Sequence, residues 1–129
     1  MKIEHLAMWV DDLELMREFY QTYFDFTSGE KYTNEKKGYS SYFLAFGDGK
    51  TRLELMSCKD ITGEPGKRGL MKGIAHFAIS VGSEEAVNKL TERLRRDNYT
   101  IESKPRITGD RYYESVVLDP EGNYIEIMV

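Results

Sequence analysis

Hydrophobic and polar positions follow two different periodicities at the start of the chain. Residues 3–10 alternate with a period of two, which predicts a strand. One face of that strand carries Ile3, His5, Ala7 and Trp9. Apolar residues then recur at helical spacing after Asp11 or Asp12, either of which is suited to cap a helix. The apolar stripe of the predicted helix is formed by Leu13, Met16, Phe19, Tyr20, Tyr23 and Phe24.

The pattern then returns to strands, punctuated by turns. We expect strands near 28–34, 39–46 and 51–57, with turn signals at 37–38 and 47–49. The Asp48-Gly49 pair inside the second turn is typical of a hairpin.

The same order of elements recurs after a segment rich in glycine and charge. Residues 58–72 predict a linker. Beyond it we expect a strand near 74–81 and a helix capped by Ser83, with Val87, Leu90 and Leu94 on its inner face. The remaining strands are expected near 100–106, 112–118 and 123–129. Each half therefore follows a β-α-β-β-β pattern.

An internal repeat explains this symmetry. Residues 2–10 align with residues 73–81, so His76 lies 71 positions after His5. Glu126 lies 72 positions after Glu54, again inside a shared apolar-Glu-apolar-Met pattern. We predict one α+β domain over 1–129, made of a first module (1–57), the linker and a second module (73–129). Neither half closes a barrel alone, so the two are expected to bury their inner faces jointly.

Composition narrows the function classes. The chain has 129 residues, a net charge of −4 and one cysteine, which excludes an intrachain disulfide and a cysteine-rich zinc module. It has no basic excess for nucleic acid or for a membrane surface, and no apolar run of about 20 residues that would span a bilayer. The N-terminus is charged at once and lacks a signal-peptide core, so we expect a cytoplasmic protein.

The repeated histidines and glutamates point to a metal site. A strand carboxylate between apolar neighbours is costly to bury unless it is paired or binds a metal, and Glu54 and Glu126 both have this setting. With His5 and His76 they would give two nitrogen and two oxygen ligands, suited to Zn, Ni, Co, Mn or Fe. The plainer alternative is a half-exposed histidine and a solvent-facing glutamate on each alternating strand, which an ancestral duplication would also copy.

Five segments carry a resemblance to a known family. They are Ile3–Ala7, Glu18–Phe26, Leu53–Met56, Ile74–Ile79 and the Asp-Pro-Glu-Gly-Asn-Tyr-Ile-Glu run of 119–126. In this combination the chain resembles the vicinal oxygen chelate superfamily, which includes glyoxalase I, bleomycin-resistance proteins and extradiol dioxygenases. The resemblance implies two βαβββ modules that form a cupped mixed sheet around one divalent metal ion.

Within that superfamily the His-Glu-His-Glu set resembles glyoxalase I. The implied activity is a metal-dependent lyase or isomerase reaction, in which a proton moves between carbons next to a carbonyl. The resemblance implies that Glu126 is the base and Glu54 its symmetric partner, both also metal ligands.

Departures from glyoxalase I lie at the positions expected to recognise the substrate. Trp9 stands where that family usually has an arginine for glutathione, so Trp9 is a candidate substrate contact instead. Lys104 and Arg106 are candidates for an anionic group, or else an ordinary solvated charge pair. Tyr113 is a further candidate lining residue, although tyrosine is also common in strands.

Two other functions remain alternatives. A fosfomycin-type thiol transferase would need a loop rich in Ser, Gly and Asn, which the sequence lacks. A bleomycin-resistance-like module would bind a small molecule without catalysis and without a metal. The resemblance also implies a homodimer, and the sequence leaves open whether the two halves complete a site within one chain or between two.

Overall fold

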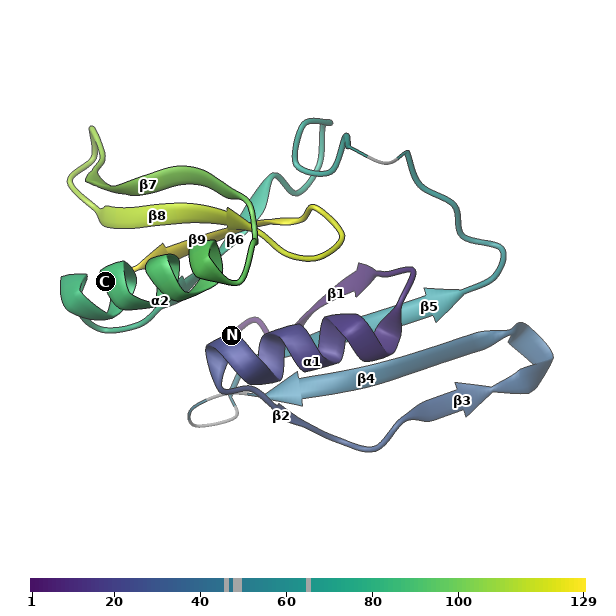
Figure 1. The fold of residues 1–129 in the computed structure, drawn as a ribbon. Coiled ribbons are helices and arrows are strands. Elements are labelled where there is room, and N and C mark those ends of the chain that lie inside the picture. Colours follow the sequence, from purple (N-terminus) through teal and green to yellow (C-terminus); the bar gives the residue numbers. More distant parts are fainter. Residues whose placement is uncertain (46, 48–49, 65) are drawn as a thin grey trace. The chain divides into compact units, whose positions relative to one another are not determined.

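The protein is described here by a computed structural model that covers residues 1–45, 47, 50–64 and 66–129. It divides into two compact units, Met1–Gly63 and Glu64–Val129, and each is described by itself (Figure 1). The boundary falls inside the predicted linker 58–72. The predicted hairpin turn at Asp48-Gly49 lies outside the described residues.

The first unit is a mixed sheet with one helix on a face. Its elements, in chain order, are β1 (His5–Trp9), α1 (Leu13–Phe24), β2 (Thr27–Ser28), β3 (Tyr32–Asn34), a 3-10 helix (Glu35–Lys37), β4 (Tyr39–Ala45) and β5 (Arg52–Cys58). The strand order is β1-β5-β4-β2, with β3 also paired to β4. β1 runs parallel to β5, and the other pairs are antiparallel. The strand predicted near 28–34 is thus two short strands, separated by the polar stretch 29–31.

Helix α1 forms where the sequence predicts it. The Asp12 carboxylate accepts hydrogen bonds from the amides of Glu14 and Leu15, both at 3.0 Å, which satisfies two donors of the first turn. The helix ends where Asp25 adopts a left-handed conformation (φ 54°). Most of the predicted stripe is buried against the sheet, and Tyr23 is only half-buried.

The second unit repeats this plan. Its elements are β6 (His76–Ser80), α2 (Glu84–Arg96), β7 (Ile101–Ile107), β8 (Tyr113–Leu118) and β9 (Tyr124–Met128), with strand order β6-β9-β8-β7. β6 runs parallel to β9, as β1 does to β5.

Helix α2 has a smaller and more polar buried face than α1. Its N-cap is Ser83, as predicted. Val87, Thr91 and Leu94 are buried, whereas the predicted Leu90 is only half-buried. Hydrophobic periodicity does not predict that Thr91 is buried, because its hydroxyl is polar. Inside the unit that hydroxyl is satisfied by the Val87 carbonyl at 2.7 Å and the Ser115 hydroxyl at 2.6 Å.

These two units confirm the predicted α+β class and the two βαβββ modules. The assembly of both modules into one domain stays a prediction. No helix of the described residues has the length and apolar character needed to cross a membrane.

Candidate metal centre

The parallel pairing of β1 with β5 brings one histidine and one glutamate together. Ala7 lies opposite Glu54 in the register, and His5 lies two residues before Ala7 on the same face. This face is opposite the one covered by α1, because Leu53 and Leu55 on either side of Glu54 are buried beneath the helix. The His5 Nε2 atom is 3.7 Å from Glu54 Oε2.

The second unit produces the same pair by the same register. Ala78 lies opposite Glu126, and His76 lies two residues before Ala78. The His76 Nε2 atom is 3.2 Å from Glu126 Oε2. The four predicted ligands are therefore found as two equivalent pairs. Among the described residues, no cluster of three or more metal-ligand side chains is formed.

In the first pair, a second carboxylate contacts the other ring nitrogen of the histidine. Glu4 contacts His5 Nδ1 through Oε2, and its Oε1 accepts a hydrogen bond from Arg52 Nε at 3.0 Å. The hydrogen bond from His5, followed by that from Arg52, holds the pKa of Glu4 below its usual value. Histidines that bind metals commonly bond a carboxylate through the other ring nitrogen, which fixes the tautomer and the ring orientation. His5 has this arrangement, with Nε2 on the side of Glu54.

A tyrosine hydroxyl bonds the glutamate of the first pair. Tyr39 donates a hydrogen bond to Glu54 Oε1 at 3.0 Å. Burial raises the pKa of the Tyr39 phenol, so it stays protonated and able to donate at neutral pH. The rings of Trp9 and Tyr32 each contact the Tyr39 ring, with centroids 6.1 Å apart.

The surroundings of the second pair are acidic instead. Glu114 is buried and lies on the same face of the sheet as Glu126, since it pairs with Met128 in the β8–β9 register. Burial, and next the negative charge of Glu126, raises the pKa of Glu114. Arg106 Nη1 is 3.7 Å from the Glu114 carboxylate.

The donor set fits a divalent ion. Each pair offers one imidazole nitrogen and one carboxylate oxygen, the ligand types preferred by Zn, Ni, Co, Mn and Fe. The glutamate side chains are only 12% and 20% exposed, which is costly for a carboxylate that has no partner cation. The histidine side chains are 39% and 45% exposed, so both imidazole rings are accessible from solution.

The residues predicted to contact the substrate differ in their position relative to the His–Glu pair of their own unit. Trp9 lies on the face of His5 and Glu54 and is 41% exposed. Lys104 is exposed on β7, and Arg106 lies beside Glu114 as described above. Tyr113 donates a hydrogen bond to Asn88 Oδ1 on α2 at 2.9 Å, so it lies on the helix side of its sheet, away from Glu126.

Sequence reasoning missed three residues around the pairs. Glu4 is adjacent to a predicted ligand, and this adjacency was a usable signal. Tyr39 and Glu114 lie on other strands, so only the cross-strand register shows that they share a face with the glutamates.

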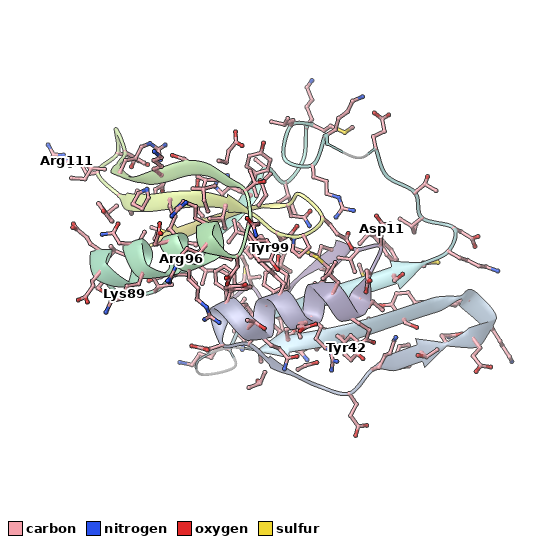
Figure 2. The ribbon with its side chains drawn as sticks, in the orientation of Figure 1. Asp11, Tyr42, Lys89, Arg96, Tyr99 and Arg111 are labelled. Atoms are coloured by element: carbon pink, nitrogen blue, oxygen red, sulfur yellow. The ribbon has the colours of Figure 1, made fainter. Side chains whose placement is uncertain are left out.

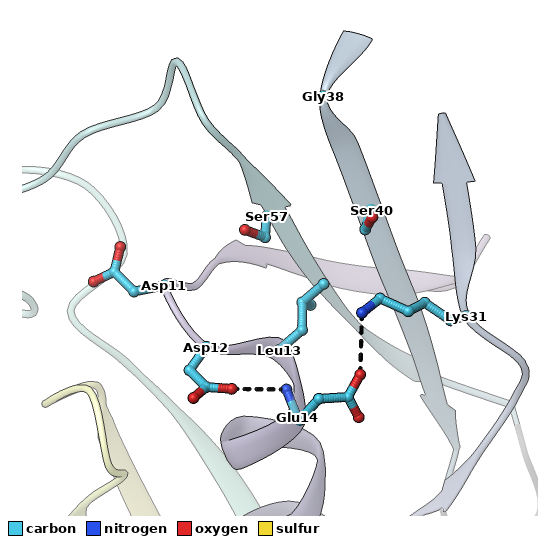
Figure 3. Close-up of a pocket in the computed structure, with 8 residues that line it drawn as sticks. All are labelled: Asp11, Asp12, Leu13, Glu14, Lys31, Gly38, Ser40 and Ser57. Atoms are coloured by element: carbon cyan, nitrogen blue, oxygen red, sulfur yellow. Dashed lines mark hydrogen bonds and ion pairs between the residues drawn. The ribbon is translucent and has the colours of Figure 1, made fainter. Parts of the chain in front are cut away.

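A pocket of about 310 Å³ lies on the other face of the first sheet, at the start of α1 (Figure 3). It is lined by Asp11, Asp12, Leu13, Glu14, Lys31, Gly38, Ser40 and Ser57. The Glu14 carboxylate of this pocket is already paired with the Lys31 ammonium group. Glu14 accepts hydrogen bonds from Lys31 at 3.1 Å and from Tyr42, labelled in Figure 2, at 2.9 Å. These two hydrogen bonds, in that order, lower the pKa of Glu14.

Known proteins share this fold. Residues 2–127 match the Glyoxalase/Bleomycin resistance protein/Dioxygenase superfamily, and the chain belongs to that family. The uncharacterised protein YqjT of Bacillus subtilis (strain 168) is 23% identical over 129 residues, which span 98% of this chain and 97% of YqjT.

Solved structures agree with the family. A possible glyoxalase from Bacillus cereus is 29% identical, with a TM-score of 0.74, and the match covers 100% of this chain and 99% of that one. The trypanothione-dependent glyoxalase I of Leishmania major is 24% identical, with a TM-score of 0.79, covering 99% and 86% of the two chains. The likeness to the Leishmania enzyme shows the fold alone.

Proposed function

We propose that this protein is a metal-dependent lyase or isomerase of the glyoxalase I type. The observation that carries the proposal is the equal register of the two His–Glu pairs, one in each sheet. A duplicated structural histidine alone would not require a half-buried glutamate within 4 Å of it in both units. Membership of the superfamily supports the same function.

The ligands in this proposal are His5, Glu54, His76 and Glu126, which bind one divalent ion within one chain or between two copies. When bound, this ion would supply Lewis acidity for substrate oxygens next to the reacting carbon. The Glu126 carboxylate takes a proton from that carbon and returns it to the neighbouring carbon, so one C–H bond breaks, another forms, and no net oxidation occurs. Glu54 is its symmetric partner.

The proposed substrate is a small carbonyl compound, including the adduct of such a compound with a thiol. Trp9 offers an exposed ring on the face of the first pair. Lys104 and Arg106 offer positive charge on β7 for an anionic group. The proposed site does not include Tyr113, because its hydroxyl is bonded to α2. We further propose a homodimer, as the family resemblance implies, and a cytoplasmic location, as the sequence predicts.

An activity assay tests this proposal. Purified protein is loaded separately with Zn, Ni, Co, Mn or Fe and mixed with hemithioacetals of methylglyoxal made from several thiols. We expect isomerisation with at least one metal and thiol. Glu126→Gln should lower kcat by about 10²- to 10⁴-fold, the usual contribution of a positioned base. Glu102→Gln, an exposed glutamate on β7, is the matched control and should leave kcat unchanged.

Other outcomes separate the alternatives. Turnover of an epoxide antibiotic with a thiol, in place of hemithioacetal turnover, would favour the thiol transferase. Tight binding of a planar drug by metal-free protein, without turnover of any substrate, would favour the binding module.

A further inference from the structure

The two His–Glu pairs have the same backbone register, yet their glutamates differ in one contact. The Tyr39 hydroxyl donates a hydrogen bond to Glu54 Oε1, while Glu54 Oε2 is the atom that faces His5 Nε2. One carboxylate oxygen is therefore held by the phenol, and the other is left directed at the histidine. A carboxylate bonded in this way has lost most of its freedom to rotate about its last torsion.

Tyr39 is itself fixed by its surroundings. It lies on the same face as Glu54, because Phe43 pairs with Glu54 and Tyr39 is four residues earlier on β4. The rings of Trp9 and Tyr32 contact its ring at interplanar angles of 87° and 60°. These edge and tilted contacts restrict the ring, so the hydroxyl is presented to Glu54 without a large further loss of entropy.

We infer that Tyr39 is a positioning residue, which holds Glu54 in the orientation needed to bind the metal ion. This inference rests on the proposed function. Outer hydrogen bonds to metal-binding carboxylates typically change metal affinity by about 10- to 100-fold when they are removed. Tyr39 acts through Glu54 and takes no part in proton transfer.

The second unit has a tyrosine at the matching position, and it provides a control. Glu114 pairs with Met128 as Ser41 pairs with Met56, so Tyr112 corresponds to Tyr39. Tyr112 is 52% exposed. Within the residues that the structure describes, no tyrosine hydroxyl bonds Glu126, whose contact is with His76.

Cobalt binding by the full chain tests the inference. Co(II) is titrated into wild-type protein, Tyr39→Phe and Tyr112→Phe, and both the dissociation constant and the visible d–d spectrum are recorded. We expect Tyr39→Phe to raise the dissociation constant about tenfold or more and to shift the d–d bands, because the coordinating carboxylate becomes free to reorient. Tyr112→Phe should leave both within twofold of wild type. The melting temperature of each metal-free protein confirms that the fold is intact.

The outcomes separate this inference from the proposed function. If wild type binds Co(II) and Tyr39→Phe has the same affinity and spectrum, the positioning role is wrong and the metal site stands. An equal loss in both variants would also overturn it, since the effect would then not be specific to Glu54. If wild type binds no Co(II), the proposed function fails, and the role of Tyr39 fails with it.

Discussion

The two halves of this chain form the same His–Glu pair, but the residues around the pair differ. In the first half, Glu4 bonds His5 and Tyr39 bonds Glu54. In the second half, Ala75 occupies the position of Glu4 in the repeat, and the buried Glu114 lies on the face of Glu126. The parallel register alone sets the His–Glu pair, so it is common to both halves. The surrounding residues are free to differ, and in the first half Glu4, next to His5 in the chain, and Tyr39 on β4 give the pair two supporting hydrogen bonds.

The largest expected effect tests whether both halves contribute to metal binding. His5→Ala and His76→Ala should each weaken Co(II) or Zn binding by at least about a hundredfold, because a four-ligand site gains several kcal/mol from each ligand. Competition with a chromophoric chelator measures the affinity. Glu102→Ala, on the exposed side of β7, is the control. Normal affinity after loss of either histidine would break the equivalence of the halves.

The next effect concerns how each helix is attached to its sheet. Tyr42 and Ser115 occupy matching sheet positions, and each bonds the helix of its own unit. The Thr91–Ser115 pair is buried, so Thr91→Val leaves a buried serine hydroxyl without this partner. We expect the free energy of unfolding to fall by about 1–3 kcal/mol, measured by urea denaturation. Adding Ser115→Ala should recover part of the loss; an unchanged stability in Thr91→Val would contradict this account.

A smaller effect is expected from loss of the Glu4 carboxylate, which contacts His5 Nδ1. Glu4→Ala removes the acceptor at His5 Nδ1, so the imidazole loses a fixed orientation and metal affinity should fall about tenfold. Isothermal titration with Co(II) measures the change. Glu35→Ala, in the exposed 3-10 helix of the same unit, should bind Co(II) like wild type. Equal affinities for Glu4→Ala and wild type would show that the first pair needs no such support.

The smallest expected effect concerns the contact between helix and sheet in the first half, where Glu14 of α1 bonds Tyr42 of β4. The pKa of Glu14 is lowered on folding, so its ionised form contributes stability above the unfolded value of 4.5, and this contribution is lost as the pH falls through the folded pKa. The side chain is 51% exposed, which weakens its ion pairs through solvent screening. Glu14→Gln should therefore cost about 0.5–1 kcal/mol at pH 7 and progressively less as the pH falls below 4.5. Thermal unfolding of both proteins at pH 7 and at pH 3 measures the change, with Glu102→Gln as the control. An equal loss of stability at the two pH values would contradict this prediction.

Periodicity in the sequence was enough to predict most of the helices and strands, and the repeat placed one histidine and one glutamate at matching positions of each half. Neither the periodicity nor the repeat was enough to predict which residues on neighbouring strands contact each other. Tyr39 reaches Glu54 only because β4 and β5 pair in one register, and a shift of one residue would put the tyrosine on the helix side. Thr91 was missed for a related reason, since a polar residue is compatible with a core position only when a partner such as Ser115 is present.

The stoichiometry of the bound ion tests the central claim most directly. Metal-free protein is titrated with Co(II) in a calorimeter, and the metal content of the dialysed complex is measured by elemental analysis. If both His–Glu pairs bind the same ion, the protein holds one ion per chain, whether the site forms within a chain or between two copies. Two ions per chain would mean that each pair binds metal on its own, and none would mean that the pairs are structural; either result would contradict the account.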